Sequence, residues 1–239
     1  MAEERIVVVG GGIAGVSAVR TLVESGAGDR AVLINGESYL PYKRTKLSKH
    51  IADGKNADEF SLESESWYAE HGVTLLSDVT VDAIDRESMQ VTLSDGTTQN
   101  YGRLILATGA DPRYPSVVAE EGREFALLVR NQADIDLLRK SVKSARKVLV
   151  VGMGVLGVEV SAQLKKMKKQ VTLAGATPLL MPRHLNPQAA EMLEGVLRAH
   201  DIRLWFQEEV LRIERRRKGG FSVHLLHENS RFDAVVFCV

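Results

Sequence analysis

The nine residues PYKRTKLSK, at positions 41–49, carry four cationic side chains and no acidic one. Arg and Lys side chains bind phosphate groups through charge-assisted hydrogen bonds, but a run of like charges is more often a solvated surface. The stretch follows an apolar segment that reads as a β-strand. Taken alone, it allows two interpretations: the cations face water, or they face a phosphate.

Two glycine-rich sequences, GGGIAG at 10–15 and GMGVLG at 152–157, have the spacing G-x-G-x-x-G. In this pattern the first glycine allows a tight turn, the second lets the backbone approach a pyrophosphate, and the third lets the helix pack on the strand. These functions fall to Gly10, Gly12 and Gly15 in the first copy and to Gly152, Gly154 and Gly157 in the second. Each copy follows a β-branched run and precedes a helical pattern, so the spacing predicts two dinucleotide-binding turns.

A carboxylate at the end of the second strand, about 20 residues further on, accepts a hydrogen bond from the ribose in this type of site. Glu37, 22 residues after Gly15, fits that position in the first copy. The second copy reads TLAGAT at 172–177 and has no carboxylate there. Arg183 and His184 follow and could meet the 2′-phosphate of NADP, or they could be exposed loop residues. The choice between NADH and NADPH stays open.

The elements around these turns repeat one plan. Apolar strands at 5–9 and 147–151 are each followed by an amphipathic helix and a second apolar strand, and the copies lie 142 residues apart (Gly152 minus Gly10). Residues 73–106 then alternate apolar and polar side chains, which predicts antiparallel strands that return to a parallel one, and a similar pattern ends the chain. The predicted fold is α/β, with two Rossmann-like, doubly wound dinucleotide-binding domains that each carry a β-meander.

Composition excludes several other classes of protein. The 239 residues contain 31 Lys and Arg against 31 Asp and Glu, so neither nucleic acid nor an anionic membrane is an expected partner. Cys238 is the single cysteine, which excludes an internal disulfide, a Cys-x-x-Cys redox pair and a thiolate metal site. The histidines lack metal-ligand spacing, so no metal site is predicted. Without a membrane-length apolar run or a signal-peptide pattern, a cytoplasmic protein is expected.

Four segments together resemble the pyridine nucleotide-disulfide oxidoreductase superfamily: VVVGGGIAGVSA, PYKRTKLSK, LILATGADPR and VLVVGMGVLGVEVSAQL. PYKRTKLSK is similar to a block in the branch of rubredoxin reductases, ferredoxin reductases and apoptosis-inducing-factor-like proteins. The N-terminal part of nitrite reductase large subunits is similar too. Branches with an active-site disulfide carry two cysteines on the first domain, where this chain has none. The resemblance implies an FAD-binding domain at residues 1–114 and an NAD(P)-binding domain at residues 115–239, the second inserted in the first.

The resemblance also implies roles for individual residues. The implied FAD contacts are Gly10, Gly12, Gly15, Glu37, Arg44, Lys49, Val81, Ala107, Thr108 and Gly109. The implied contacts to NADH or NADPH are Gly152, Gly154 and Gly157. Lys49 and Glu159 match the lysine and the glutamate that this branch places near the flavin, and they are the predicted catalytic residues. We expect an ion pair between them beside the flavin ring.

The implied activity is that of a flavin-dependent NAD(P)H oxidoreductase. Such an enzyme moves a hydride from the nicotinamide to N5 of FAD and passes electrons to a small electron-carrier protein of the rubredoxin or ferredoxin type. The alternatives are a slow-turnover nucleotide-binding or redox-sensing flavoprotein, and the N-terminal fragment of an NAD(P)H-nitrite reductase large subunit. Family members continue beyond DAVVFCV with a third FAD motif and an interface domain. We therefore expect a fragment that binds FAD weakly or lacks it, while the full-length protein could be a homodimer.

Overall fold

The computed structural model describes residues 4–112, 126–217 and 219–238. The chain divides into two compact units: residues 1–44 with 56–110, and residues 45–55 with 111–239. The short segment 45–55 therefore belongs to the second unit, although the sequence on both sides of it belongs to the first. The predicted boundary between residues 114 and 115 lies outside the described residues.

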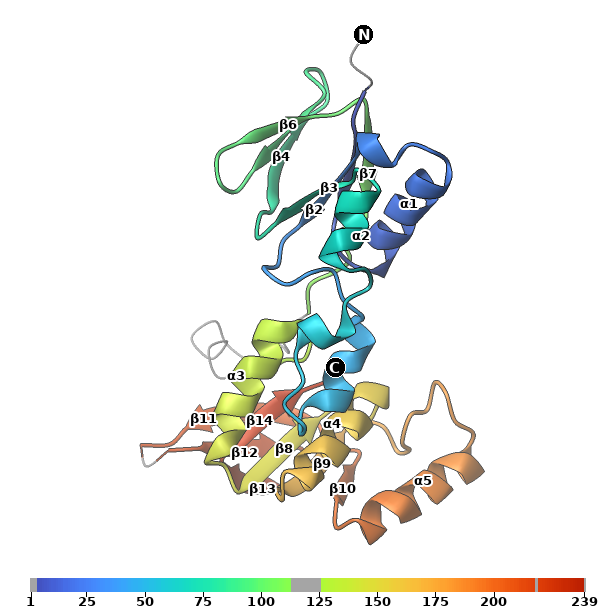
Figure 1. Cartoon of the computed structure of the whole chain (residues 1–239). Helices are drawn as coiled ribbons and strands as arrows, with labels where there is room; N and C mark the ends of the chain where they lie inside the picture. The colour runs from blue at the N-terminus through green and yellow to red at the C-terminus, as the bar shows by residue number, and fades with distance from the viewer. Residues whose placement is uncertain (1–3, 113–125, 218, 239) are drawn as a thin grey trace. The chain divides into compact units, whose positions relative to one another are not determined.

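The first unit is built on a parallel sheet with the strand order β3-β2-β1-β7 (Figure 1). In chain order its elements are β1 (Ile6–Val9), α1 (Ile13–Glu24), the 3₁₀ helix η1 (Gly28–Arg30), β2 (Ala31–Asn35), η3 (Ala57–Phe60), α2 (Glu65–Glu70), β3 (Thr74–Ser77), β4 (Val81–Asp85), β5 (Gln90–Leu93), β6 (Thr98–Asn100) and β7 (Arg103–Leu106). The strands β4, β5 and β6 form a separate antiparallel sheet.

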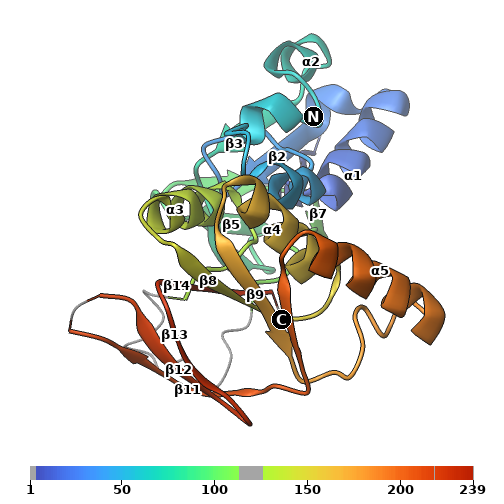
Figure 2. The ribbon, with the colours of Figure 1, turned by 90° about the horizontal axis from the view of Figure 1, so that it is seen from below.

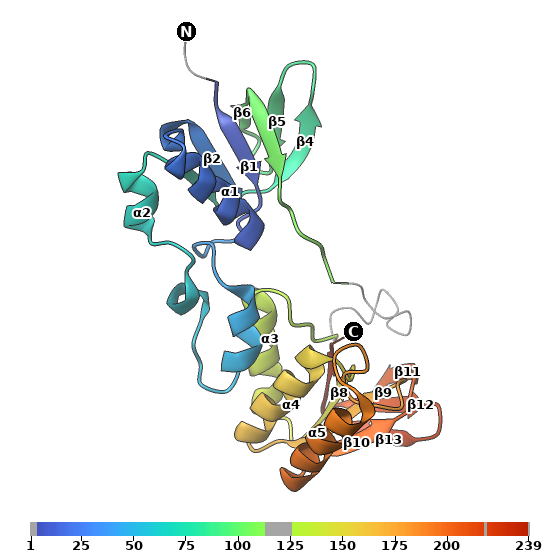
Figure 3. The same ribbon diagram turned by 90° about the vertical axis from the view of Figure 1, so that its right-hand side faces the viewer.

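Both faces of the parallel sheet are covered, which is why its strands are continuous apolar runs. On one face, apolar residues of β1 and β2 pack against Val16 and Val19 of α1. On the other face, the alternate residues of the same strands pack against Val91 and Leu93 of β5 (Figure 3). Because β1 is buried on both faces, its position is fixed, and so is the start of the first glycine turn, which follows it directly.

The second unit repeats this plan, with the parallel strand order β10-β9-β8-β14. Its elements are η2 (Arg44–His50, which begins at the last residue of the first unit), α3 (Gln132–Lys143), β8 (Lys147–Val151), α4 (Val155–Lys166), β9 (Gln170–Gly175), α5 (Pro187–Ala199), β10 (Arg203–Phe206), β11 (Val210–Arg215), β12 (Phe221–Leu225), β13 (Asn229–Phe232) and β14 (Ala234–Phe237). The helices α3 and α4 lie on one face of the parallel sheet and the sheet β11-β12-β13 lies on the other (Figure 2).

Two stretches that read as continuous strands are broken at the same place in each unit. The prediction of antiparallel strands across 73–106 holds for β4 to β6, but β3 pairs in parallel with β2. Asp78, with φ of 61°, turns the chain after β3, and Gln207, with φ of 56°, does the same after β10. A residue in the left-handed region ends an extended strand, so the first part of each stretch joins the parallel sheet instead of the meander.

Two kinds of feature are absent from the described ranges. None of the helices there combines the length and apolarity that a membrane span requires. No group of three or more His, Cys, Asp or Glu side chains there has the geometry of a metal site.

Candidate functional site

The first glycine turn closes tightly between β1 and α1. Gly10 has φ of +114°, which L side chains rarely adopt, and a Cβ atom there would collide with the carbonyl oxygen of Ala107. A Cβ atom at Gly15 would collide with the carbonyl oxygen of Gly10. Gly12, the N-cap of α1, has no atom within 4 Å of its Cβ position and no side-chain cap. The start of α1 is therefore an open cluster of backbone N–H groups, the arrangement that binds a phosphate anion.

The second turn has nearly the same geometry. Gly152 has φ of +119°, and a Cβ atom at Gly157 would collide with the carbonyl oxygen of Gly152. Gly154 caps α4 with extended backbone and, like Gly12, has an open Cβ position. The predicted glycine turns thus have the backbone conformation, the close packing and the open helix start that their spacing requires.

A pocket of about 590 Å³ lies at the carboxyl ends of the parallel strands of the second unit. It is lined by Val151, Gly152, Met153, Gly154, Gly175, Ala176, Thr177, Met181, Pro182, Arg183, His184, Glu208, Glu209, Val210, Phe237 and Cys238. Its volume is in the range of small-molecule and cofactor sites, and this edge of the sheet is where open α/β folds bind ligands.

The loop after β9 forms one wall of this pocket. Met181 donates its backbone N–H to the carbonyl oxygen of Met153 in the glycine turn at 2.8 Å, which ties the loop to the turn. His184 N–H donates to the carbonyl oxygen of Met181. Arg183 and His184, which the sequence left as exposed loop residues or phosphate contacts, are exposed and line the pocket.

Matching backbone hydrogen bonds show which residues of the two units correspond. Asp78 N–H donates to the carbonyl oxygen of Glu37 in the first unit, and Gln207 N–H donates to the carbonyl oxygen of Thr177 in the second, each at 3.2 Å. Thr177 is therefore the counterpart of Glu37. The position predicted to carry the ribose carboxylate holds a neutral hydroxyl in the second unit.

The pocket nevertheless contains two carboxylates that the sequence reasoning missed, Glu208 and Glu209. Glu208 is buried, and its Oε2 accepts a hydrogen bond from the backbone N–H of His227 at 3.0 Å. Both follow β10, not β9, so the spacing rule for the ribose carboxylate does not find them. Only the pairing of β10 beside β9 brings them to this edge.

Glu37 lies in a cluster with two residues of the PYKRTKLSK stretch. The Tyr42 hydroxyl donates to Glu37 Oε2 at 2.7 Å, and Arg44 donates to Glu37 Oε1 at 2.5 Å. The Arg44 guanidinium also lies 5.4 Å from the centre of the Tyr42 ring, in the range of a cation–π contact. Two of the predicted FAD contacts, Glu37 and Arg44, are thus brought together.

The remaining predicted contacts of the first unit lie at the ends of strands. Val81 is the first residue of β4, and Val210, the first residue of β11, lines the pocket in the second unit. Ala107 donates its N–H to the carbonyl oxygen of Val9 at 2.8 Å, next to the first glycine turn, and Thr108 is exposed there. Gly109 follows with φ of 72°. Ala107 and Thr108 lie beside Gly10, because a Cβ atom at Gly10 would meet the carbonyl oxygen of Ala107 and the Cα atom of Thr108.

The predicted ion pair between Lys49 and Glu159 is present within the second unit. Lys49 Nζ lies 3.6 Å from Glu159 Oε1, and the buried Ser48 donates its hydroxyl to Glu159 Oε2 at 2.5 Å. Sequence reasoning missed Ser48, although it belongs to the same stretch. Glu159 thus holds two neighbouring side chains of η2 at once.

The ion pair alone is too weak to fix the position of Lys49. The Lys49 side chain is 53% exposed, and an exposed pair contributes roughly 1 kcal/mol or less. Leu47 and Ile51 are almost fully buried, and Ala52 N–H donates to Gln163 Oε1 of α4 at 3.4 Å. Buried apolar area contributes about 25 cal/mol per Å². Burial of Leu47 and Ile51 therefore holds this segment in place, and the ion pair orients the exposed end of the Lys49 side chain.

Asp53 closes the turn that follows η2. Its Oδ2 lies 2.6 Å from His50 Nδ1, and its Oδ1 accepts the backbone N–H of Lys55 at 3.2 Å. The hydrogen bond with His50, followed by the one from Lys55, lowers the pKa of the Asp53 carboxyl below its ordinary value. A lowered pKa means that the turn is stabilised above the ordinary value and loses that stabilisation as the pH falls through the lowered one.

Cys238 lies at the carboxyl end of β14, where its backbone N–H donates to the carbonyl oxygen of Val151 at 2.7 Å. Its thiol is free, and burial raises the pKa of Cys238 to about 12. The neutral thiol is therefore the form present near pH 7, and a neutral thiol is a poor nucleophile.

Comparisons with known proteins agree with this geometry. Residues 4–239 match the family described as pyridine nucleotide-disulphide oxidoreductase. The chain is 34% identical over 200 residues to the rubredoxin-NAD(+) reductase of Ectopseudomonas oleovorans, which is 82% of this chain and 51% of that protein. It is 29% identical over 199 residues to the ferredoxin–NAD(+) reductase subunit of the benzene 1,2-dioxygenase system of Pseudomonas putida, which is 83% of this chain and 48% of that protein.

A solved structure has a similar fold. The ferredoxin reductase for the CYP199A2 system of Rhodopseudomonas palustris aligns with a TM-score of 0.89 at 26% identity, over 99% of this chain and 59% of that one. The chain spans about half the length of the curated relatives it matches. With its paired glycine turns and a family match over residues 4–239, the chain belongs to the pyridine nucleotide-disulphide oxidoreductase family.

Proposed function

We propose that this chain is the nucleotide-binding part of a flavin-dependent NAD(P)H oxidoreductase that passes electrons to a small electron-carrier protein. The observation that carries the proposal is the pair of open helix starts at Gly12 and Gly154, each at the carboxyl end of a parallel strand. The relatives named as rubredoxin and ferredoxin reductases support the class of partner. The proposed cellular location is the cytoplasm, and a homodimer of the full-length protein stays a proposal.

We assign FAD to the first unit and NADH or NADPH to the second. The proposed FAD contacts in the first unit are Gly10, Gly12, Gly15, Glu37, Arg44, Val81, Ala107, Thr108 and Gly109. The open Cβ position of Gly12 and the polar cluster of Glu37 with Arg44 support this assignment, because they offer N–H donors for a pyrophosphate and a carboxylate for a ribose. The 590 Å³ pocket that contains Gly152 and Gly154 supports the second assignment.

Lys49 and Glu159 are the proposed catalytic residues. FAD, when bound, would supply the chemistry of this reaction, which is the acceptance of a hydride from the nicotinamide and the release of single electrons. The chain's own contribution is orientation and charge, since a cation held near developing negative charge lowers the barrier to its formation. Lys49 carries its charge on an exposed tip, and Glu159 restrains that tip from α4.

The test of the proposed function is an anaerobic titration of the full-length gene product with NADH and with NADPH. We expect a yellow protein whose flavin absorption band is bleached within seconds by one of the two nucleotides and restored by an oxidised electron carrier. A colourless product, or a flavin that neither nucleotide reduces, would contradict the oxidoreductase. Bleaching over many minutes would favour the slow-turnover sensor.

A substitution separates the role of Lys49 from that of its neighbours. Lys49→Ala is expected to slow flavin reduction in stopped-flow measurements by about tenfold or more, because it removes the cation beside the developing charge. Lys46→Ala is the matched control, since Lys46 is an exposed cation of the same helix, and it is expected to leave the rate unchanged. Equal rates for the two variants would remove Lys49 from the proposed site.

A further inference from the structure

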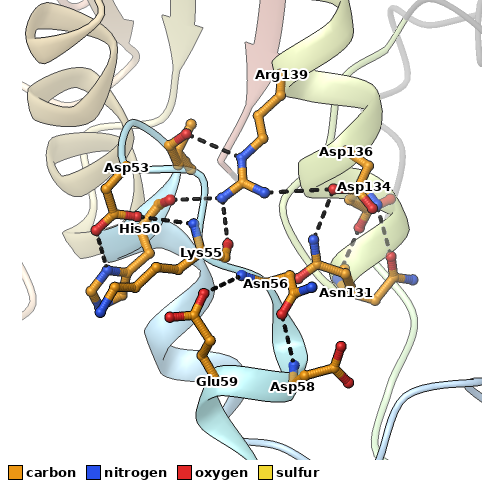
Figure 4. Close-up of polar contacts among 12 residues, drawn as sticks. His50, Asp53, Lys55, Asn56, Asp58, Glu59, Asn131, Asp134, Asp136 and Arg139 are labelled. Carbon is orange, nitrogen blue, oxygen red and sulfur yellow. Dashed lines mark hydrogen bonds and ion pairs between the residues drawn. The ribbon is translucent and has the colours of Figure 1, made fainter.

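Arg139 of α3 reaches the segment that carries Lys49 (Figure 4). Its guanidinium donates to three backbone carbonyl oxygens: that of His50 at 2.7 Å, that of Ile51 at 3.1 Å and that of Lys55 at 2.5 Å. The side chain is only 19% exposed, and Asp136 lies 3.6 Å from its other terminal nitrogen. Arg139 and these carbonyl groups all belong to the second unit.

These carbonyl groups lie at and just beyond the carboxyl end of η2. The last carbonyl groups of a helix have no partner within the helix, and a cationic donor there satisfies them and complements the helix dipole. The Asp53 turn brings the chain back, so that the carbonyl oxygen of Lys55 lies on the same guanidinium as that of His50. A guanidinium carries five N–H donors in one plane and can therefore bind three separate carbonyl oxygens, whereas the three donors of an ammonium group all lie on a single nitrogen.

Lys49 lies directly before the capped carbonyl groups. Its side chain forms an ion pair with Glu159 in which the lysine is more than half exposed. The direction of its side chain depends on the backbone of residues 48–52. This segment is joined to α4 by the Ser48 hydroxyl, which donates to Glu159, and by the backbone N–H of Ala52, which donates to Gln163. Arg139 fixes the same backbone to α3, from the other end of the turn.

We propose that Arg139 is a positioning residue for Lys49: it caps the carboxyl end of η2 and so keeps Lys49 against Glu159 for reaction with the flavin. This inference rests on the proposed function, because it assigns Arg139 a part in flavin reduction. It does not require Arg139 to touch the flavin or the nucleotide.

The test compares Arg139→Gln with Lys140→Gln in the full-length protein. Lys140 is an exposed cation on the next position of α3, so its variant removes the same charge without removing the cap. In Arg139→Gln, we expect the backbone amides of residues 48–52 to exchange hydrogen about tenfold faster or more, since the cap is lost. Flavin reduction is expected to slow several-fold, while the Kd for NADH stays within about twofold. Lys140→Gln is expected to change none of these.

A double variant shows whether Arg139 acts through Lys49. If it does, Arg139→Gln adds little to the slowing already caused by Lys49→Ala, because the residue to be positioned is absent. Full additivity of the two effects would overturn the inference, as would unchanged amide exchange or an unchanged rate in Arg139→Gln. Arg139→Lys, which keeps the charge and loses the planar group, provides the same comparison if Arg139→Gln does not fold.

Failure of the inference and failure of the proposed function give different results. If the wild-type protein reduces no flavin, the proposed function is wrong and the inference falls with it. If the wild-type protein reduces its flavin and the Arg139 variants do so at the same rate, only the inference is wrong.

Discussion

Thr177 and Glu37 occupy equivalent backbone positions in the two units, but Glu37 is a carboxylate and Thr177 is a neutral hydroxyl. Glu37 can accept hydrogen bonds from ribose hydroxyls and repels a phosphate. Thr177 is uncharged, so it accepts hydrogen bonds less strongly and does not repel a phosphate. Its hydroxyl already donates to the carbonyl oxygen of Leu179 at 2.9 Å. If the pocket binds a nicotinamide nucleotide as proposed, the preference between NADH and NADPH is expected to depend on its other charged residues, with Arg183 opposing Glu208 and Glu209.

Thr177→Glu tests this reading at the scale of one residue. A carboxylate at this position is expected to raise the Kd for NADPH relative to that for NADH by about tenfold, because it repels the 2′-phosphate and accepts from the 2′-hydroxyl. The measurement is nucleotide binding by calorimetry. Thr177→Gln has a similar size without the charge and serves as the control. If both variants changed the ratio equally, Thr177 would not lie at the ribose.

At the scale of elements, each unit depends on how closely a helix approaches the strand before it. The third glycine of each turn faces a carbonyl oxygen of the first, so no side chain fits between helix and turn. The helix start then stays open for an anion, because Gly12 and Gly154 place no atoms over it. Close packing and an open helix start are thus two results of one backbone arrangement.

Gly157→Ala is expected to destabilise the second unit by about 1–3 kcal/mol, since the added methyl group forces α4 away from the turn. Gly195→Ala, within α5, is the matched control. Apart from the neighbouring backbone of its own helix, no atom lies within 4 Å of its Cβ position, and alanine is the better helix former by about 0.5–1 kcal/mol. Urea unfolding measures both changes. Equal effects in the two variants would show that α4 does not need the close approach.

At the scale of the whole molecule, the chain is two compact units of the same architecture, and each is expected to respond to its own nucleotide. Binding to the folded state alone stabilises it by about 2.7 kcal/mol at a free ligand concentration of 100 times Kd. NADH or NADPH at this level is expected to slow hydrogen exchange in β8 and β9 by up to about 100-fold. The amides of β1 and β2 are the internal control. Protection that appeared in the first unit instead would reverse the proposed assignment of the nucleotides.

Much of this organisation could be predicted because it is encoded locally. Continuous apolar runs at 5–9, 31–34, 147–151 and 170–173 predict β1, β2, β8 and β9 as buried parallel strands, and the observed bounds differ from these by no more than two residues. The breaks at Asp78 and Gln207 escaped prediction, because a left-handed residue inside an alternating apolar pattern leaves that pattern intact. The pairing of Lys49 with Glu159 came from resemblance to a family, and the structure shows the two groups 3.6 Å apart.

The sequence by itself determined the two glycine turns, the strands before them and the lack of a carboxylate at residues 172–177. Each of these depends on the backbone or side-chain properties of a residue and its close neighbours. Only the tertiary structure decided that Ser48 shares Glu159 with Lys49, that Glu208 enters the pocket, and that Arg139 caps a segment 84 to 89 residues away. A polar side chain in a helix can reach many acceptors, and the packing of α3 and α4 against segment 45–55 selects among them.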